Sequence, residues 1–98
     1  MNIKNDLIFN LSRPSILSLA KHEHSQAFVV GLIKDQVLAK HKTAIPAVLL
    51  VLQGALQFKM NDEIIMLKKD DVYHIPVNTE HEVTGVEERN SFLIIKGE

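Results

Sequence analysis

The chain has 98 residues, the length of one domain, and a chain this short buries only about two-thirds of the surface that its unfolded form exposes. Eleven basic and twelve acidic residues give a net charge of −1, so charge provides no reason to expect a nucleic acid, an anionic membrane or a strongly charged partner. The chain has no cysteine, which excludes disulfides and thiolate chemistry and fits a reducing compartment. No stretch reaches the ~18 apolar residues of a membrane span, and we expect a cytoplasmic protein.

Residues 1–26 are predicted to form an N-terminal arm or covering segment. Residues 1–10 fit either an edge strand centred on residues 7–9 or an arm that orders against a second subunit, and we favour the arm. Ser12-Arg13-Pro14 resembles a helix start, but the apolar residues of 16–19 are separated by serines, a pattern that suits strand as well as helix.

His22 and His24 form a His-x-His pair within this segment. On a strand, this spacing puts both imidazoles on one face and is that of a metal pincer. Their neighbours are lysine, glutamate, serine and glutamine, a composition typical of a solvated turn. The surface interpretation is therefore favoured over a metal site.

The rest of the chain, residues 27–98, is predicted to be all-β and to form a barrel or sandwich in one domain. Short apolar runs rich in Val, Ile and Leu alternate with turn residues, among them Gly54 and the Asn61-Asp62 pair. Pro46 and Pro76 lack a donor for a sheet and mark loops. The predicted strands are residues 27–33, 37–41, 47–52, 55–60, 63–67, 72–75, 82–86 and 92–95.

The run from Ala47 to Leu52 is apolar at every position. A half-solvated antiparallel strand alternates apolar with polar residues, so both faces of this strand need a cover. We predict that the outer face is covered by a second copy of the chain in a two-fold homodimer. The alternative is that residues 1–20 cover it alone.

Over about residues 27–96, the chain resembles the cupin family, whose members are small double-stranded β-helix barrels of the jelly-roll kind. The first cupin motif is Gly, five residues, His-x-His, three or four residues, Glu, six residues, Gly. Its positions meet Asp35, His41, Thr43, Ala47 and Gly54 in this chain, so the histidine at 41 and the glycine at 54 are kept.

The second cupin motif is Gly, five residues, Pro-x-Gly, two residues, His, three residues, Asn. Its positions meet Asp70, Pro76, Asn78, His81 and Gly85, of which the proline and the histidine are kept. Aspartate and asparagine tolerate left-handed backbone angles almost as glycine does, so these replacements are compatible with the cupin fold. The resemblance therefore implies an all-β cupin barrel.

In the cupin family, two histidines and a glutamate of the first motif and the histidine of the second hold one divalent metal in the barrel mouth. The resemblance assigns His41 and His81 to two of these ligands, while Thr43 and Ala47 replace the other two. A catalytic metal normally has three protein ligands, so we expect weak binding of Zn, Fe, Mn or Ni at most. The replacements predict a mainly apolar ligand pocket with two imidazoles as its polar groups.

Two residues of strand 72–75 are further candidates. His74 completes the metal site if it faces inward, but the alternation of the strand leaves open whether His74 or Tyr73 does so. Tyr73 is the only tyrosine, and it is assigned to the pocket as a hydrogen-bonding residue or to the core.

The sequence thus favours a dimeric cupin barrel that binds a small, largely apolar molecule between His41 and His81. The alternative is a metal-dependent cupin enzyme of the oxygenase or isomerase kind, in which His74 or water completes the metal shell. A third hypothesis is a structural or regulatory module with a vestigial pocket, which a barrel interior filled by side chains would support.

Overall fold

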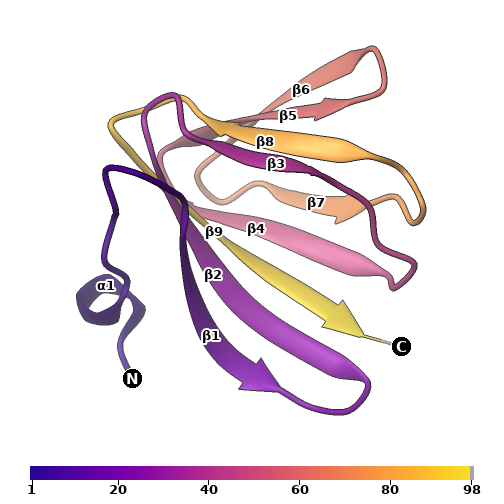
Figure 1. Ribbon diagram of the computed structural model, residues 1–98, viewed down its shortest axis with the longest axis horizontal. Coiled ribbons are helices and arrows are strands. Elements are labelled where there is room, and N and C mark those ends of the chain that lie inside the picture. The colour runs from indigo at the N-terminus through magenta and orange to yellow at the C-terminus, as the bar shows by residue number, and fades with distance from the viewer. Residues whose placement is uncertain (98) are drawn as a thin grey trace.

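The computed structural model describes residues 1–97 and all of their side chains except those of Lys40 and His41. This part of the chain folds as two antiparallel sheets that face each other (Figure 1). One sheet has the strand order β1-β2-β9-β4-β7 and the other β3-β8-β5-β6. The elements are α1 (Ile3–Asp6), β1 (Ser15–Lys21), β2 (Ser25–Ile33), β3 (Val37–His41), β4 (Ala47–Gln53), β5 (Ala55–Met60), β6 (Glu63–Lys68), β7 (Val72–Ile75), β8 (His81–Gly85) and β9 (Arg89–Gly97).

The predicted all-β fold is confirmed, and the strands follow the apolar runs of the sequence. Every second residue of a strand points inward, so Leu49 and Val51 of β4 are fully buried while Leu50 is half-buried on the outer face. The two inner faces form one core, in which the largest side chains are Phe58 of β5 and Phe92 of β9. No helix in residues 1–97 is long and apolar enough to cross a membrane.

The N-terminal segment differs from the prediction in its details. Residues 15–21, for which strand and helix had equal support, form β1, which pairs with β2 as the edge strand of the larger sheet. No helix starts at residues 12–14, because the chain there leads directly into this pairing. Residues 7–9 are not an edge strand, since Leu7 and Phe9 pack over Gly31, at which a Cβ would lie 3.2 Å from each of them. The segment is thus ordered on its own chain.

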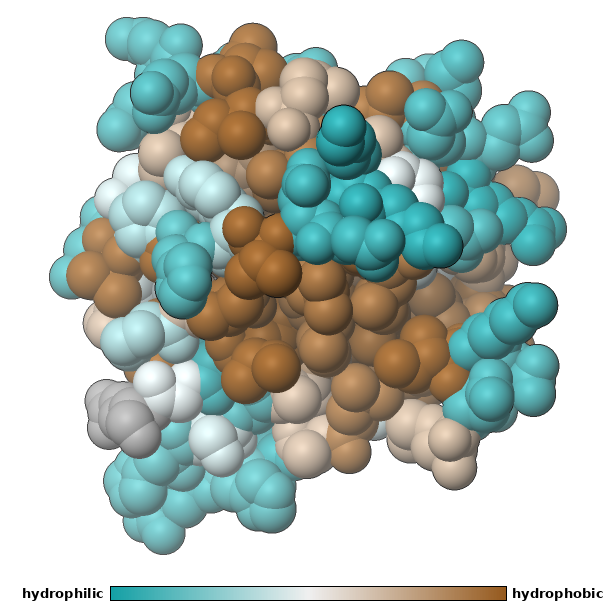
Figure 2. All heavy atoms as spheres, turned by 180° about the vertical axis from the view of Figure 1, so that it is seen from behind, coloured by the Kyte–Doolittle hydropathy of each residue, from teal (hydrophilic) through white to brown (hydrophobic). Residues whose placement is uncertain are grey.

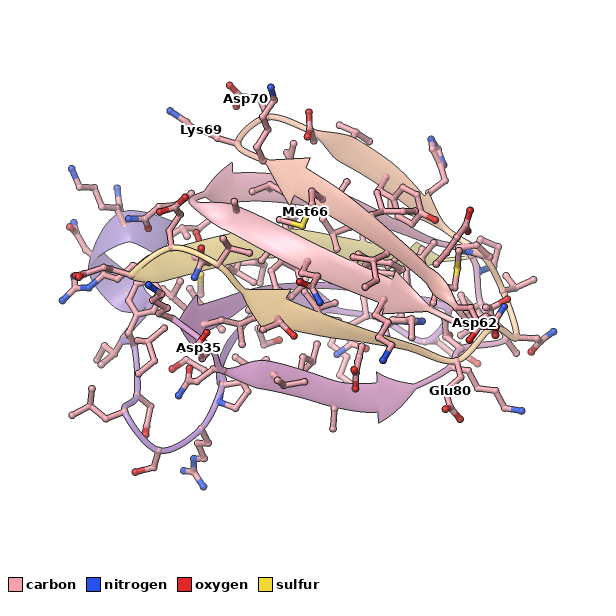
Figure 3. All side chains as sticks on the ribbon, turned by 90° about the horizontal axis from the view of Figure 1, so that it is seen from above. Asp35, Asp62, Met66, Lys69, Asp70 and Glu80 are labelled. Carbon is pink, nitrogen blue, oxygen red and sulfur yellow. The ribbon has the colours of Figure 1, made fainter. Side chains whose placement is uncertain are left out.

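The barrel has two different ends. The turns 34–36, 69–71 and 86–88 lie together at one end, which we name the closed end, and the loops 42–46 and 76–80 lie at the other, which we name the mouth. Figure 3 shows Asp35, Lys69 and Asp70 at the closed end, and Asp62 and Glu80 at the opposite end.

The backbone angles confirm the prediction that aspartate and asparagine can take the place of the glycines in the turns of the cupin motifs. Asp35, Asp70 and Asn78 have φ angles of 70°, 75° and 57°, in the left-handed region, and Gly54 has a φ of 74°. Short polar side chains adopt this region at lower cost than other non-glycine residues do. The turns of the cupin motifs therefore keep their shape without their glycines.

The side chain of Asn90 stabilises the closed end through hydrogen bonds. It is fully buried, and Oδ1 accepts hydrogen bonds from the N–H groups of Ala55 and Glu87, both at 3.0 Å. Its Nδ2 donates to the carbonyl oxygens of Leu32, at 3.1 Å, and Glu87, at 2.9 Å. Backbone bonds reinforce this end, among them Asp35 N–H to the Gly85 carbonyl at 2.9 Å. One buried amide thus connects three segments of the chain.

Candidate ligand site at the barrel mouth

A small cavity lies inside the barrel at the mouth, between the ends of both sheets. Its volume is about 30 Å³, and its walls are mainly apolar, with Phe28, Phe58 and Phe92 among them. Among the residues whose side chains are described, the polar ones in the lining are Thr43, His81 and Lys96. A cavity of this size holds about one water molecule, so the side chains fill most of the barrel interior.

His81 is the buried polar residue at this end. It begins β8 and is 3% exposed, and its ring stacks on that of Phe58 with 5.1 Å between the centroids and 16° between the planes. Its Nδ1 lies 3.1 Å from the carbonyl oxygen of Thr79. Because a carbonyl only accepts, this contact assigns the proton of the neutral ring to Nδ1 and makes Nε2 the acceptor nitrogen.

The backbone of His41 lies opposite that of His81. The two residues pair across β3 and β8, next to an irregularity in the ladder between Leu38 and His41. The side chain of His41 lies outside the described residues. The structure thus brings the backbones of the two histidines together at one end of the barrel.

Thr43 and Ala47 line the same cavity as His81. The hydroxyl oxygen of Thr43 accepts a hydrogen bond from the N–H of Ile45 at 3.1 Å, and its carbonyl accepts one from the N–H of Asn78 at 2.7 Å. These bonds shape the 42–46 loop and connect it to the 76–80 loop. Thr43 thus builds the rim of the mouth.

Tyr73 faces inward but lies outside the cavity lining. Its ring contacts Phe58 at a centroid distance of 5.0 Å, and its hydroxyl is 4.0 Å from the sulfur of Met60. Burial, and to a lesser degree the charge of Glu63, raises the pKa of Tyr73 above its ordinary value. The prediction that Tyr73 lines the pocket is therefore corrected, and Tyr73 is a core residue. Phe58 contacts both Tyr73 and His81, but of these two only His81 borders the cavity.

His74 is on the outer face of β7 and is exposed. It pairs with Val48, whose side chain also faces outward, whereas Tyr73 and the buried Ile75 take the inward positions. The alternation of the strand therefore rules out His74 as a ligand beside His81. The surface interpretation of residues 22–24 is confirmed, because both histidines are exposed and His24 lies 3.7 Å from Glu23.

The described side chains do not supply the ligand set of the cupin metal site. Among the residues whose side chains are described, no three of the types His, Cys, Asp and Glu come together in a way that could hold a metal ion. At the four motif positions, Ala47 has no donor atom and the Thr43 hydroxyl is bonded within its own loop. A three-ligand site of the family kind is thus not formed by these residues.

Lys96 is a site residue that the sequence analysis missed. It is half-buried at the end of β9, and its Nζ lies 5.4 Å from the ring centroid of Phe28, a cation–π contact. The predicted strand ended at residue 95. The alternation of the inward residues Phe92 and Ile94 continues to Lys96, and this pattern could have assigned the lysine to the mouth.

Neither a protein-family model nor a curated protein matches the chain. Solved structures with the same fold do match. A cupin superfamily protein from Desulfitobacterium hafniense is 20% identical with a TM-score of 0.85, over 93% of this chain and 83% of that one. An uncharacterized conserved protein with a double-stranded β-helix domain from Klebsiella pneumoniae is 15% identical with a TM-score of 0.89, over 99% and 87%.

A third similar structure is a cupin 2 conserved barrel domain protein from Leptotrichia buccalis, which is 19% identical with a TM-score of 0.89. The match covers 100% of this chain and 47% of that one. At these identities the likeness concerns the fold. The chain therefore has the cupin fold, a double-stranded β-helix in a single small domain, as the two motifs predicted.

Proposed function

We propose that this chain is a dimeric binding protein whose mouth accepts a small, mainly apolar molecule with one anionic or hydrogen-bond-accepting group. The observation that carries the proposal is the position of Lys96, a cation with N–H donors, at a cavity whose other described lining residues are apolar except for Thr43 and His81. Binding sites for small molecules are typically apolar with a few polar groups that fix the orientation of the ligand.

The size of the cavity restricts the ligand. With about 30 Å³ available, a molecule enters only if a side chain at the rim moves. Lys96 and Phe28 are the best candidates, because both are half-buried and line the cavity. We therefore propose a ligand with a compact apolar part, of the size of a short branched chain.

The chemistry of the donors favours binding over metal-dependent catalysis of the oxygenase or isomerase kind. A metal in the mouth would have the imidazoles of His41 and His81 as ligands, and two are fewer than a tightly held catalytic metal needs. Titration with Zn²⁺, Ni²⁺, Mn²⁺ or Fe²⁺ is expected to give weak binding that His81→Ala abolishes and His74→Ala leaves unchanged. Stoichiometric tight binding would instead favour the enzyme.

The ligand proposal is tested with two compounds of one shape. Isobutyrate and isobutyramide share an apolar part and differ in charge, so we expect the carboxylate to bind more tightly. Lys96→Met should weaken isobutyrate binding by about tenfold, the effect of a charge-assisted hydrogen bond, and change isobutyramide binding less. Lys42→Met is the control, because Lys42 is exposed in a mouth loop and outside the lining. Equal effects of both variants would contradict the proposal.

A second candidate is a module whose barrel binds nothing. The filled interior favours it, because most of the space between the sheets is occupied by side chains. Failure of isobutyrate, isobutyramide and the metals to bind, together with an intact dimer, would support this candidate over the first.

The proposed dimer uses the part of the outer face of the five-stranded sheet that Val48, Leu50, Val72 and Ile95 form. Val72 and Ile95 are 57% and 50% exposed there, next to the half-buried Val48 and Leu50 of β4. Figure 2 shows hydrophobic side chains gathered across the middle of this face. Contiguous apolar surface of this kind is typical of an interface. The lack of cysteine favours a reducing compartment, and we propose the cytoplasm.

The dimer is tested by light scattering after gel filtration, which should give twice the 11.1 kDa mass of the chain. Ile95→Lys is expected to produce monomers, since it introduces a charge into the proposed interface. Ile64→Lys is the matched control, because Ile64 is 56% exposed on the four-stranded sheet. A monomeric wild-type protein, or equal behaviour of the two variants, would contradict the dimer.

A further inference from the structure

A groove of about 620 Å³ lies outside the barrel, between the N-terminal segment and the outer face of the five-stranded sheet. It is far larger than the cavity of about 30 Å³ at the mouth and falls in the usual range for small-molecule sites, roughly 300–1,000 Å³. Its apolar wall comes from Leu7 and Phe9 on one side and from Leu52, near the end of β4, on the other. We name it the α1 groove.

The α1 groove is bordered by three cations. Lys4 lies in α1, Lys69 in the turn between β6 and β7, and Arg89 at the start of β9. The guanidinium carbon of Arg89 lies 5.4 Å from the centroid of the Phe9 ring, a contact that connects a cation of the rim to the apolar wall. The groove therefore presents positive charge next to apolar surface.

Among the described residues that line the α1 groove, none carries a carboxylate. Asp6 of α1 accepts the N–H of Asn2 at 2.8 Å and faces a different surface depression. Asp70 projects from the same turn as Lys69 but is not part of the lining (Figure 3). In the described part of the chain, none of the three cations of the rim forms an ion pair. The positive charge of the rim is thus not neutralised locally, although the whole chain has a net charge of −1.

We propose that the α1 groove binds a single-chain carboxylate of medium length. The hydrocarbon tail would cover Leu7, Phe9 and Leu52, and the carboxylate would lie between Lys69 and Arg89. Burial of apolar surface supplies most of the affinity, and the cations select the sign of the head group. This site is separate from the mouth, and the proposal does not depend on the ligand or the metal proposed there.

The first test uses two amphiphiles with the same tail and opposite charge. Decanoate, below its micellar concentration, is expected to bind the wild-type protein saturably with one site per chain. Decyltrimethylammonium should bind at least about tenfold more weakly, because it meets three cations of its own sign. Octanoate should bind more weakly than decanoate, by about two- to fourfold for each methylene removed. No binding of decanoate, or equal binding of both amphiphiles, would overturn the proposal.

The second test changes the rim. Lys4→Glu combined with Lys69→Glu should weaken decanoate binding by about tenfold, since both side chains are exposed and each exchange reverses a charge. Lys21→Glu is the control, because Lys21 is exposed at the end of β1 and lies outside the groove. A control that weakens binding equally would mean that only the net charge matters and would overturn the proposal.

The third test locates the ligand by amide chemical shifts. Decanoate should shift the resonances of Leu7, Leu52 and Ser91, which line the α1 groove, and leave those of Ala47 and Val83 at the mouth unchanged. Shifts confined to the mouth would overturn this inference and support the mouth as the binding site. Shifts confined to the groove would leave the isobutyrate experiment to decide the function of the mouth.

Discussion

The two ends of this barrel differ in the kind of interaction that their buried residues make. At the closed end, a fully buried asparagine uses its amide in four hydrogen bonds, and glycines admit the backbone close to it. At the mouth, a histidine that is 3% exposed lies among apolar side chains beside a small cavity. A fully satisfied polar group specifies one packing, whereas an apolar cavity can adapt to a ligand. One fold thus separates the residues that hold it together from those available for binding.

The largest expected effect is at Asn90. Asn90→Ala leaves the N–H of Ala55 and the carbonyl of Leu32 without their partner in the interior, and each such group costs about 1–3 kcal/mol. We expect the free energy of unfolding to fall by about 3 kcal/mol or more, measured by denaturant titration. Asn5→Ala, at an exposed position of α1, is the matched control and should change it by less than about 0.5 kcal/mol. Similar values for both variants would mean that the closed end is not fastened by this amide.

Gly54→Ala should be almost as costly. The φ of Gly54 is +74°, and a Cβ there would lie 2.5 Å from the Arg89 carbonyl oxygen and also overlap the Asn90 side chain. Left-handed backbone alone costs a non-glycine residue about 1–2 kcal/mol, and the overlap adds to this. Asp70→Gly, at a φ of 75° in a nearby turn, is the complementary variant and should cost little or nothing. An unchanged stability of Gly54→Ala would show that the closed end is looser than described.

His81→Ala should cost less than either change at the closed end. The variant loses the stacking on Phe58 and enlarges the cavity, and aromatic pairs of this kind contribute about 0.5–1.5 kcal/mol beyond their burial. We therefore expect a loss of about 2 kcal/mol in the free energy of unfolding. A loss of stability larger than that of Asn90→Ala would reverse the assignment of roles to the two ends.

The smallest effect concerns Tyr73, the only tyrosine, behind the mouth. Because burial and Glu63 raise its pKa in the folded state above 10.0, the folded protein keeps the phenol proton when the unfolded chain has released it. The contribution of this raised pKa to the free energy of unfolding is fully present below pH ~10 and is lost as the pH rises above that value. The alkaline decline of the unfolding free energy should be smaller in Tyr73→Phe. Tyrosinate absorbance of the native protein with a midpoint at or below 10.0 would contradict the assignment.

Much of the fold could be predicted from the sequence because the signals were local. Apolar runs bounded by turn residues gave the strands, and the capacity of Asp35, Asp70 and Asn78 for left-handed angles explained how the cupin turns survive without glycine. The resemblance to the cupin motifs implied that His41 and His81 lie at one end of the barrel, and their backbones do pair.

The remaining features depend on tertiary packing. Asn90 lies in a polar stretch typical of an exposed turn, and only the fold shows that its amide is buried. The outward position of His74 is fixed by the burial of Ile75, which a four-residue strand does not reveal by itself. The α1 groove depends on segments far apart in the chain that meet in space, whereas the alternation along β9 is a local signal for Lys96.

The central claim is that the mouth is the adaptable end of the barrel and admits a ligand beside His81. Amide chemical shifts recorded during a titration with isobutyrate test it most directly. We predict saturable shifts at Ala47, His81 and Val83 and constant resonances at Gly54, Gly85 and Asn90. Shifts at the closed end, or no saturable change at the mouth, would contradict this account.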